Sequence, residues 1–206
     1  MDWVTVASLA TAAGTLVLAI ATFQATSSAN RAARAAERAL MAGLRPVLVN
    51  SRMQDASQKI MWGDQHWARL EGGFGYAVHE GDVVYLAMSV RNAGAGLAIL
   101  RAWHAQAGLI QERDHLDLAR FRDQSRDLYV APDDIGFWQG ARRDPRDADH
   151  DEIVRAVDDA QPITVEVLYT DADGGQRTVS RFTLMPASEG RRVISVSRHW
   201  RLDDEP

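Results

Sequence analysis

The residues best suited to metal chemistry form an acidic cluster around one histidine, His150. Asp147, Asp149 and Glu152 lie close to it in the chain. Carboxylates together with an imidazole are ligands for divalent cations. Acidic residues are equally suited to the first turn of a helix, where they cap backbone N–H groups and oppose the helix dipole. Two interpretations therefore stand side by side: a metal site and a helix start.

The other candidate ligands are weaker. The six histidines show neither HxH nor HExxH spacing. The run from Asp171 to Gly174 has the look of a calcium loop, but it lacks the third ligand and the distal glutamate of an EF-hand. An Asp-Gly hairpin turn explains this run better. We therefore predict no resident metal and no cofactor.

Motifs for covalent or nucleotide chemistry are missing from the sequence. There is no cysteine, which excludes disulfides, thiolate zinc sites and a cysteine nucleophile. No GxSxG or SxxK motif occurs, and the glycines at 72–75 have neither the P-loop lysine nor GxGxxG spacing. The net charge of −5 argues against a nucleic-acid binder, because such domains are usually basic. The sequence thus favours a protein that is neither an enzyme nor a nucleic-acid binder.

One aromatic and basic segment, residues 137–145, has the composition of an interaction surface. Aromatic and arginine side chains dominate binding hot spots. In the alternative interpretation the two aromatics belong to the core, because large aromatics are mostly buried, and the arginines pair with Asp144 and Asp147. The interaction candidates in this segment are Phe137, Trp138, Arg142 and Arg143.

The element expected to locate the chain is an apolar N-terminal helix. Residues 3–23 carry no charge, and a helix needs roughly 20 apolar residues to cross a bilayer. A cleaved signal peptide normally begins with basic residues, and this chain instead has Asp2 there. The small residues at 25–29 could nevertheless form a cleavage site. A buried core helix would be shorter or amphipathic. We predict a retained transmembrane anchor.

The helix is predicted to continue past the bilayer to about Ala42, because residues 27–41 are strong helix formers without Gly or Pro. Residues 1–44 would then form one anchoring unit. The basic flank predicts an N-terminus outside and a C-terminal domain in the cytoplasm. Its arginines either contact anionic lipid headgroups or serve only as a topology signal and a solvated face. These residues are Arg31, Arg34 and Arg38.

Small residues recur along the same helix at a spacing that lets two helices approach closely. An Ala- and Thr-rich helix also produces such lines by chance, so self-association of the helix is a hypothesis only. The clearest line consists of Ala7, Thr11, Thr15 and Ala19.

Beyond residue 45 the apolar pattern changes from helical to alternating. Antiparallel strands joined by turns, with little room for parallel crossovers, predict a mainly β fold behind the long helix. The specific expectation for residues 45–206 is an immunoglobulin-like antiparallel β-sandwich with short helical insertions. Residues 54–80 are expected to form a long hairpin or loop. Strands are predicted at 46–53, 83–91, 97–107, 163–169, 178–185 and 192–202, and helices at 115–126 and 150–159.

Several segments resemble an uncharacterised family of single-span bacterial membrane proteins that is common in actinobacteria. The resemblance implies an N-terminal helix and a cytoplasmic β-sandwich, and it carries over no activity and no catalytic residues. Besides the anchor, the segments are Leu44-Arg45-Pro46, Val90-Arg91-Asn92-Ala93-Gly94, Leu128-Tyr129-Val130-Ala131-Pro132, Gly136-Phe137-Trp138-Gln139-Gly140, Tyr169-Thr170-Asp171, Gly174-Gly175-Gln176-Arg177 and Ser197-Arg198-His199-Trp200.

Taken together, these patterns favour a membrane-anchored cytoplasmic β-sandwich that acts as a binding or scaffolding module. One alternative is an accessory subunit of a larger complex, held by an unidentified membrane-protein partner. The other is a metal-dependent enzyme that uses His150 with Asp147, Asp149 or Glu152.

Overall fold

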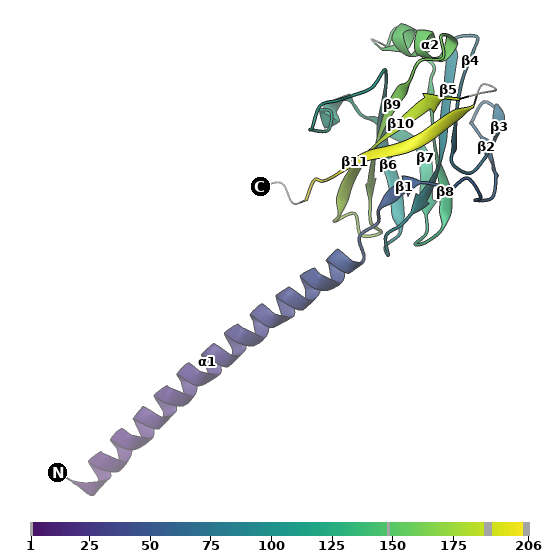
Figure 1. Ribbon diagram of the computed structural model, residues 1–206. Helices are drawn as coiled ribbons and strands as arrows, with labels where there is room; N and C mark the ends of the chain where they lie inside the picture. The colour runs from purple at the N-terminus through teal and green to yellow at the C-terminus, as the bar shows by residue number, and fades with distance from the viewer. Residues whose placement is uncertain (1, 148, 188–190, 204–206) are drawn as a thin grey trace. The chain divides into compact units, whose positions relative to one another are not determined.

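The computed structural model describes residues 2–147, 149–187 and 191–203 of the 206-residue chain, without the side chains of residues 5, 10 and 38. The chain divides into two compact units, residues 1–43 and 44–206 (Figure 1). The first is a single helix and the second is mainly β. The predicted fold class, mainly β with a long N-terminal helix, is confirmed.

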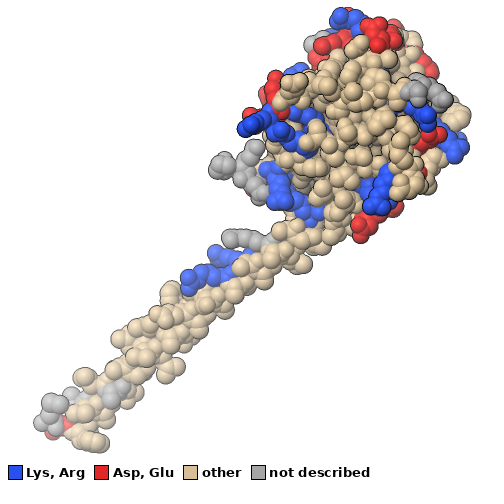
Figure 2. Space-filling view, in the orientation of Figure 1, with Lys and Arg blue, Asp and Glu red and all other residues tan. Residues whose placement is uncertain are grey.

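The N-terminal unit is helix α1, Trp3–Gly43, whose 41 residues span about 62 Å at about 1.5 Å per residue. It is long and apolar enough to cross a bilayer, and its side chains are almost all exposed. Figure 2 shows few charges over the N-terminal half of its visible face and basic side chains farther along. Its hydroxyls donate to the carbonyl four residues earlier, as from Thr15 to Thr11 at 2.9 Å, so these polar groups are satisfied within the helix.

The second unit is built on a curled antiparallel sheet of nine strands. Along the hydrogen-bonded path their order is β1-β5-β4-β11-β10-β9-β6-β7, and β8 pairs with β5. The strands are β1 (Leu48–Asn50), β4 (Phe74–Glu80), β5 (Val83–Asn92), β6 (Ala98–Ala107), β7 (Arg122–Val130), β8 (Ile135–Arg142), β9 (Ile163–Thr170), β10 (Arg177–Pro186) and β11 (Arg192–Arg201).

The sheet folds over one apolar core. We call the strands β1, β4, β5 and β8 the β5 half, and the strands β6, β7, β9, β10 and β11 the β9 half. The two halves are joined between β4 and β11 by two residue pairs, Gly75↔Arg192 and Phe74↔Val193. Because the strand order is continuous across this joint, a two-sheet immunoglobulin-like sandwich is not confirmed. The core draws side chains from both halves, among them Leu86, Leu100, Val165 and Phe182.

A separate hairpin covers the outer face of the β5 half. It consists of β2 (Gln58–Met61) and β3 (Trp67–Leu70), and falls in the stretch predicted as a long hairpin or loop. Because side chains alternate along a strand, the hairpin turns one row inward and the other to solvent. The inward row packs on Tyr85 and Ala87 and consists of Ile60, Trp62, Ala68 and Leu70.

A different element covers the outer face of the β9 half. We call residues 109–121 the cover segment; it holds only a short 3₁₀ helix, η1 (Leu118–Arg120). Beneath it, Arg181 and Glu166 form a buried ion pair at 2.6 Å. Glu166 also accepts the Leu116 N–H at 3.0 Å, and Arg181 donates to the carbonyls of Glu112 and Asp114, each at 2.7 Å. The sheet thus holds the segment by its backbone.

Two parts of the predicted secondary structure need correction. The helix expected at residues 115–126 is wrong, because only η1 forms there and strand β7 begins at Arg122. Strand β7 is an edge strand rich in charged, exposed side chains, so it lacks the apolar alternation that marks a half-buried strand. Strand β8 was not predicted either. By contrast, the second helix is confirmed as α2 (His150–Asp158).

Candidate functional site

The most distinctive feature of the β unit is the seam between β7 and β8. These strands follow one another along the chain, joined by residues 131–134, yet they do not pair. Instead β7 pairs with β6 and β8 with β5. They approach closely beside the turn, where a Cβ atom on Gly136 would lie 2.6 Å from the Val130 side chain. Only glycine fits there without a shift of its neighbours.

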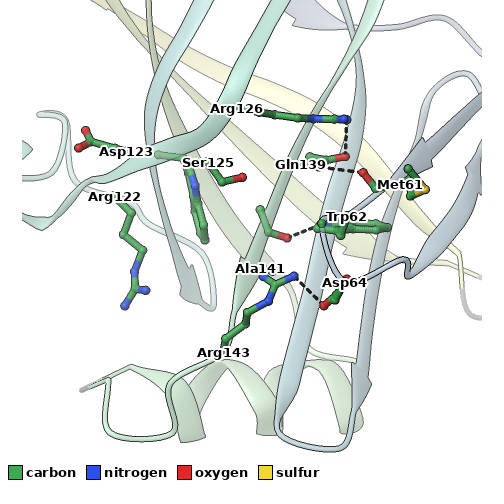
Figure 3. A pocket seen from close by; sticks show the side chains of 13 residues that line it. Met61, Trp62, Asp64, Arg122, Asp123, Ser125, Arg126, Gln139, Ala141 and Arg143 are labelled. Atoms are coloured by element: carbon green, nitrogen blue, oxygen red, sulfur yellow. Dashed lines mark hydrogen bonds and ion pairs between the residues drawn. The ribbon is translucent and has the colours of Figure 1, made fainter.

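Away from the turn the seam holds a cleft of about 720 Å³. Figure 3 shows Arg122 and Asp123 on one side of the cleft and Met61 and Asp64 on the other. Indole rings line it from two elements, Trp62 after β2 and Trp103 in β6. This volume lies in the range of small-molecule and short-peptide sites, which combine apolar walls with a few polar groups.

The side chain and backbone of Gln139 form the polar centre of the cleft. Its carbonyl accepts the Gln124 side-chain amide at 2.8 Å across the seam, while the next carbonyl, of Gly140, accepts the Trp62 indole N–H at 3.0 Å. Its own amide donates to the Met61 carbonyl at 3.3 Å and accepts from Arg126 at 3.1 Å. The Gln139 carbonyl therefore takes a side-chain donor from across the seam.

The arginines around the cleft differ in their partners. Arg122 forms an ion pair with Asp147, and Arg143 forms one with Asp64 at 2.7 Å. Arg126 donates to Gln139 and lies over the Phe137 ring, 5.7 Å from its centroid. Within the described part of the chain no carboxylate lies within ion-pair distance of Arg126. Its charge is therefore available to an anionic ligand.

Asp64 is held in its ionised form at the cleft rim. Burial alone would raise the pKa of this carboxyl, but hydrogen bonds from Tyr85 and Arg143 and from the backbone N–H of His66 together lower it. The Tyr85 hydroxyl lies 2.7 Å from the carboxylate. Conversely, burial and this bond to Asp64 raise the pKa of Tyr85. At neutral pH the rim thus contains a fixed Tyr–Asp–Arg group.

The four interaction candidates fall on opposite faces of β8. Trp138 is fully buried against Trp103, with ring centroids 5.2 Å apart, which confirms the core interpretation for this residue. Arg142 is buried as well and donates to the Ala105 carbonyl at 2.8 Å. Phe137 is half-buried, and Arg143 is exposed at the cleft. The expected pairing of the arginines with Asp144 and Asp147 is wrong: Arg142 pairs with Asp149 and Arg143 with Asp64.

The acidic residues around His150 are engaged separately. Asp147 pairs with Arg122, and Asp149 lies 3.4 Å from Arg142. The His150 ring is 3.1 Å from the Asp82 carbonyl, while Glu152 is exposed in the first turn of α2. In the described parts of the chain no group of three or more His, Asp or Glu side chains could hold a metal ion. Asp151 and Glu152 lie in the first turn of α2, as the helix-start interpretation expects, but Asp149 at the N-cap makes no side-chain capping hydrogen bond.

The structure also locates the turn predicted at residues 171–174 and part of the basic stripe on α1. Gln176 donates its backbone N–H to Asp171 at 3.1 Å and Gly174 has φ +75°, which confirms a turn between β9 and β10. On α1, Arg31 and Arg34 are exposed, whereas the side chain of Arg38 lies outside the described residues. Contact of this basic stripe with lipid stays a prediction.

Sequence reasoning missed Arg126, Gln139 and Trp103 as site residues. No motif links them, because they come from three strands that meet only through the curl of the sheet. Comparisons with protein-family models, with curated proteins and with solved structures find no match to this chain.

Proposed function

We propose that the chain is a membrane-anchored, non-enzymatic binding module that takes its ligand in the seam cleft. The observation that carries this proposal is the pairing of indole walls with Arg126, a cation without a carboxylate partner in the described chain. Aromatic surface binds a flat apolar group, and a guanidinium binds a carboxylate or phosphate by charge-assisted hydrogen bonds. The ligand class is therefore an apolar body that carries an anionic group.

The proposal includes the place of the module in the cell. Residues 3–23 of α1 would cross the bilayer, with the N-terminus outside and the β unit in the cytoplasm, in agreement with the basic flank. That flank would contact anionic headgroups, and small residues on α1 would let two copies associate. The single apolar core enclosed between the two halves supports an immunoglobulin-like sandwich as the finer description of the β unit.

Naphthalene-2-carboxylate is a suitable probe for the ligand class. Its binding to the full chain in phosphatidylcholine nanodiscs can be measured by surface plasmon resonance, with empty nanodiscs as the reference. We expect saturable binding that Arg126→Gln weakens at least fivefold, whereas Arg155→Gln on the exposed face of α2 leaves it unchanged. The uncharged carboxamide should bind both proteins equally weakly. Two results would contradict the proposal. One is no detectable binding of the probe at about 1 mM, the concentration at which weak ligands bind. The other is an equal loss of affinity in the Arg126→Gln and Arg155→Gln variants.

Orientation can be tested directly because the chain has no cysteine. Single cysteines at Asp2 and at Asp151, which is exposed on α2, would each react with a maleimide. In intact cells a membrane-impermeant maleimide should label Asp2→Cys and spare Asp151→Cys until the membrane is opened. The reverse pattern would invert the proposed topology.

A second candidate, an accessory subunit of a larger membrane complex, is favoured by the solvent face of the β2–β3 hairpin. Met61 is 54% exposed and Trp67 is 61% exposed. Lys59 lies 4.9 Å from the Trp67 ring, and aromatic and cationic side chains together are typical of interface hot spots. Purification in mild detergent from the native host should then yield a stoichiometric membrane partner, and Trp67→Ser with Met61→Ser should lose it.

A further inference from the structure

The outer edge of β8 has the properties of a strand that accepts another strand. Within the described chain β8 pairs on one side only, with β5, and its sequence between Ile135 and Ala141 carries no charged residue. Natural edge strands are usually protected by charges, prolines or bulges. Strand β7 shows this protection: four of its nine side chains are charged, and its pairing with β6 is interrupted between Leu128 and Asp123. Strand β8 instead has side chains bonded to its carbonyls.

Side-chain bonds of this kind can be exchanged for backbone bonds. The Gln139 carbonyl is held by the side-chain amide of Gln124, from across the seam. Gln124 uses its side-chain nitrogen for this bond, and its Oε1 is buried without a donor in the described chain. A buried unsatisfied acceptor costs free energy until a donor arrives. Peptide N–H groups would supply donors for these oxygens.

We propose that the occupant of the seam cleft is an extended peptide with an acidic side chain, which adds to the edge of β8 as a further strand. Its backbone N–H groups would bond to the Gln139 carbonyl and to Oε1 of Gln124, and its carboxylate would pair with Arg126. Strand addition uses backbone bonds for affinity and alternate side chains for specificity. This inference rests on the proposed function and names its ligand class.

The test uses a heptapeptide, Ac-Thr-Val-Asp-Val-Thr-Val-Thr-NH₂, and the full chain in phosphatidylcholine nanodiscs. Successive N–H groups of an extended peptide point to opposite edges, so methylating the three valine nitrogens blocks one edge. Methylating the nitrogens of the aspartate and of the two following threonines blocks the other. We expect one pattern to weaken binding at least tenfold and the other to change it less than twofold. Amide exchange in residues 136–143 should slow when the unmethylated peptide binds.

Protein variants test the acidic contact. Arg126→Gln should weaken the aspartate peptide at least fivefold and leave its asparagine counterpart unchanged, whereas Arg155→Gln should change neither. The proposal is overturned if both methylated peptides bind as well as the parent, or if no peptide binds while naphthalene-2-carboxylate does; the second result leaves the proposed function standing. Concentration-dependent dimerisation that Arg126→Gln abolishes, without peptide binding, would assign the seam to a second copy and also overturn it.

Discussion

The two outer faces of the curled sheet are covered in opposite ways. Over the β5 half lies a hairpin whose two strands bond to one another through their backbones, so the face beneath it is mainly apolar, as at Ala87, with a few hydrogen bonds such as that from Tyr85 to Asp64. Over the β9 half lies the cover segment, whose only regular element is the short helix η1. There the sheet provides buried Glu166 and Arg181 to hold the backbone.

The difference follows from one requirement: buried backbone N–H and C=O groups must find partners. A cover that brings its own secondary structure can be held by non-directional apolar contact. A cover without secondary structure needs polar side chains from below, at fixed positions. The first kind of cover should tolerate substitutions of similar volume, and the second should fail when a single partner is removed.

The largest expected effect comes from breaking the ion pair. Arg181→Met leaves the Glu166 carboxylate buried without a cation and frees the carbonyls of Glu112 and Asp114. We expect the free energy of unfolding of the β unit to fall by about 3–5 kcal/mol, measured by urea denaturation. Adding Glu166→Leu should recover part of this loss, because no unpaired charge then remains. A loss below about 1 kcal/mol in the single variant would show that the cover does not depend on the pair.

The matching change on the other face is Leu70→Ala, on the inner side of the hairpin. Leu70 is buried, and its truncation should cost about 2–4 kcal/mol through lost apolar contact and the cavity left behind. Leu70→Met, of similar volume, should cost less than about 1.5 kcal/mol. Met61→Ala, on the exposed side of the hairpin, is the control and should change stability by less than about 0.5 kcal/mol. Equal losses for the alanine and methionine variants at position 70 would contradict an apolar, volume-tolerant cover.

A smaller effect is expected where the hairpin face carries its polar group. Tyr85→Phe removes the hydroxyl that donates to Asp64 and should cost about 1–2 kcal/mol. The pKa of Asp64 should rise in this variant, because it loses a hydrogen bond that favours the ionised form. A carboxyl whose pKa is lowered by folding stabilises the fold when the pH is above the pKa of that carboxyl in the unfolded chain. This stabilisation is lost as the pH falls below about 4. NMR titration of the Asp64 carboxyl tests this, and an unchanged pKa would contradict it.

The smallest expected effect is a pH dependence of stability at mildly acidic pH on the side of the cover segment, which should not occur on the hairpin side. Burial, followed by the nearby charges of Arg142 and Arg120, lowers the pKa of His104, while Asp149 opposes the shift weakly. Its Nδ1 lies 3.2 Å from the Arg120 carbonyl at the end of the cover segment. Because the unfolded chain binds the proton more readily, stability should fall as the pH drops below about 6.5, by at most about 1.4 kcal/mol per pH unit.

The His104→Asn variant should reduce this pH dependence of the unfolding free energy, and amide exchange should quicken in residues 109–121 before it does in the hairpin. Burial also lowers the pKa of His199, so this residue can contribute to the same pH dependence, and the His199→Asn variant measures its share. A hairpin that loosens first on acidification would reverse the comparison.

The sequence allowed prediction of the elements that carry a regular apolar period. These are the long apolar helix α1, the amphipathic helix α2, and strands such as β5 and β9, which alternate in sequence although both of their faces are buried. Strand β7 failed because an exposed edge needs charge rather than alternation. The cover segment failed because its order comes from side chains elsewhere in the chain, such as Arg181.

The candidate site was less predictable than the fold. The turn at residues 171–174 places Glu166 opposite Arg181 by register, but their burial depends on the cover segment. The cleft depends on how far β7 and β8 separate, which neither strand encodes alone. Trp138 illustrates the limit: composition marked it as important, and only the fold shows that it points inward.

The joint between the two halves also has a consequence for synthesis. In the strand order, β11 stands between β4 and β10, and it follows every other strand along the chain. The two halves can therefore be hydrogen-bonded into one sheet only after residues 192–201 have left the ribosome, at about 5–20 residues per second. Until then the β5 half and strands β6, β7, β9 and β10 share no backbone ladder, so the interval before β11 arrives is when a chaperone would have most to protect.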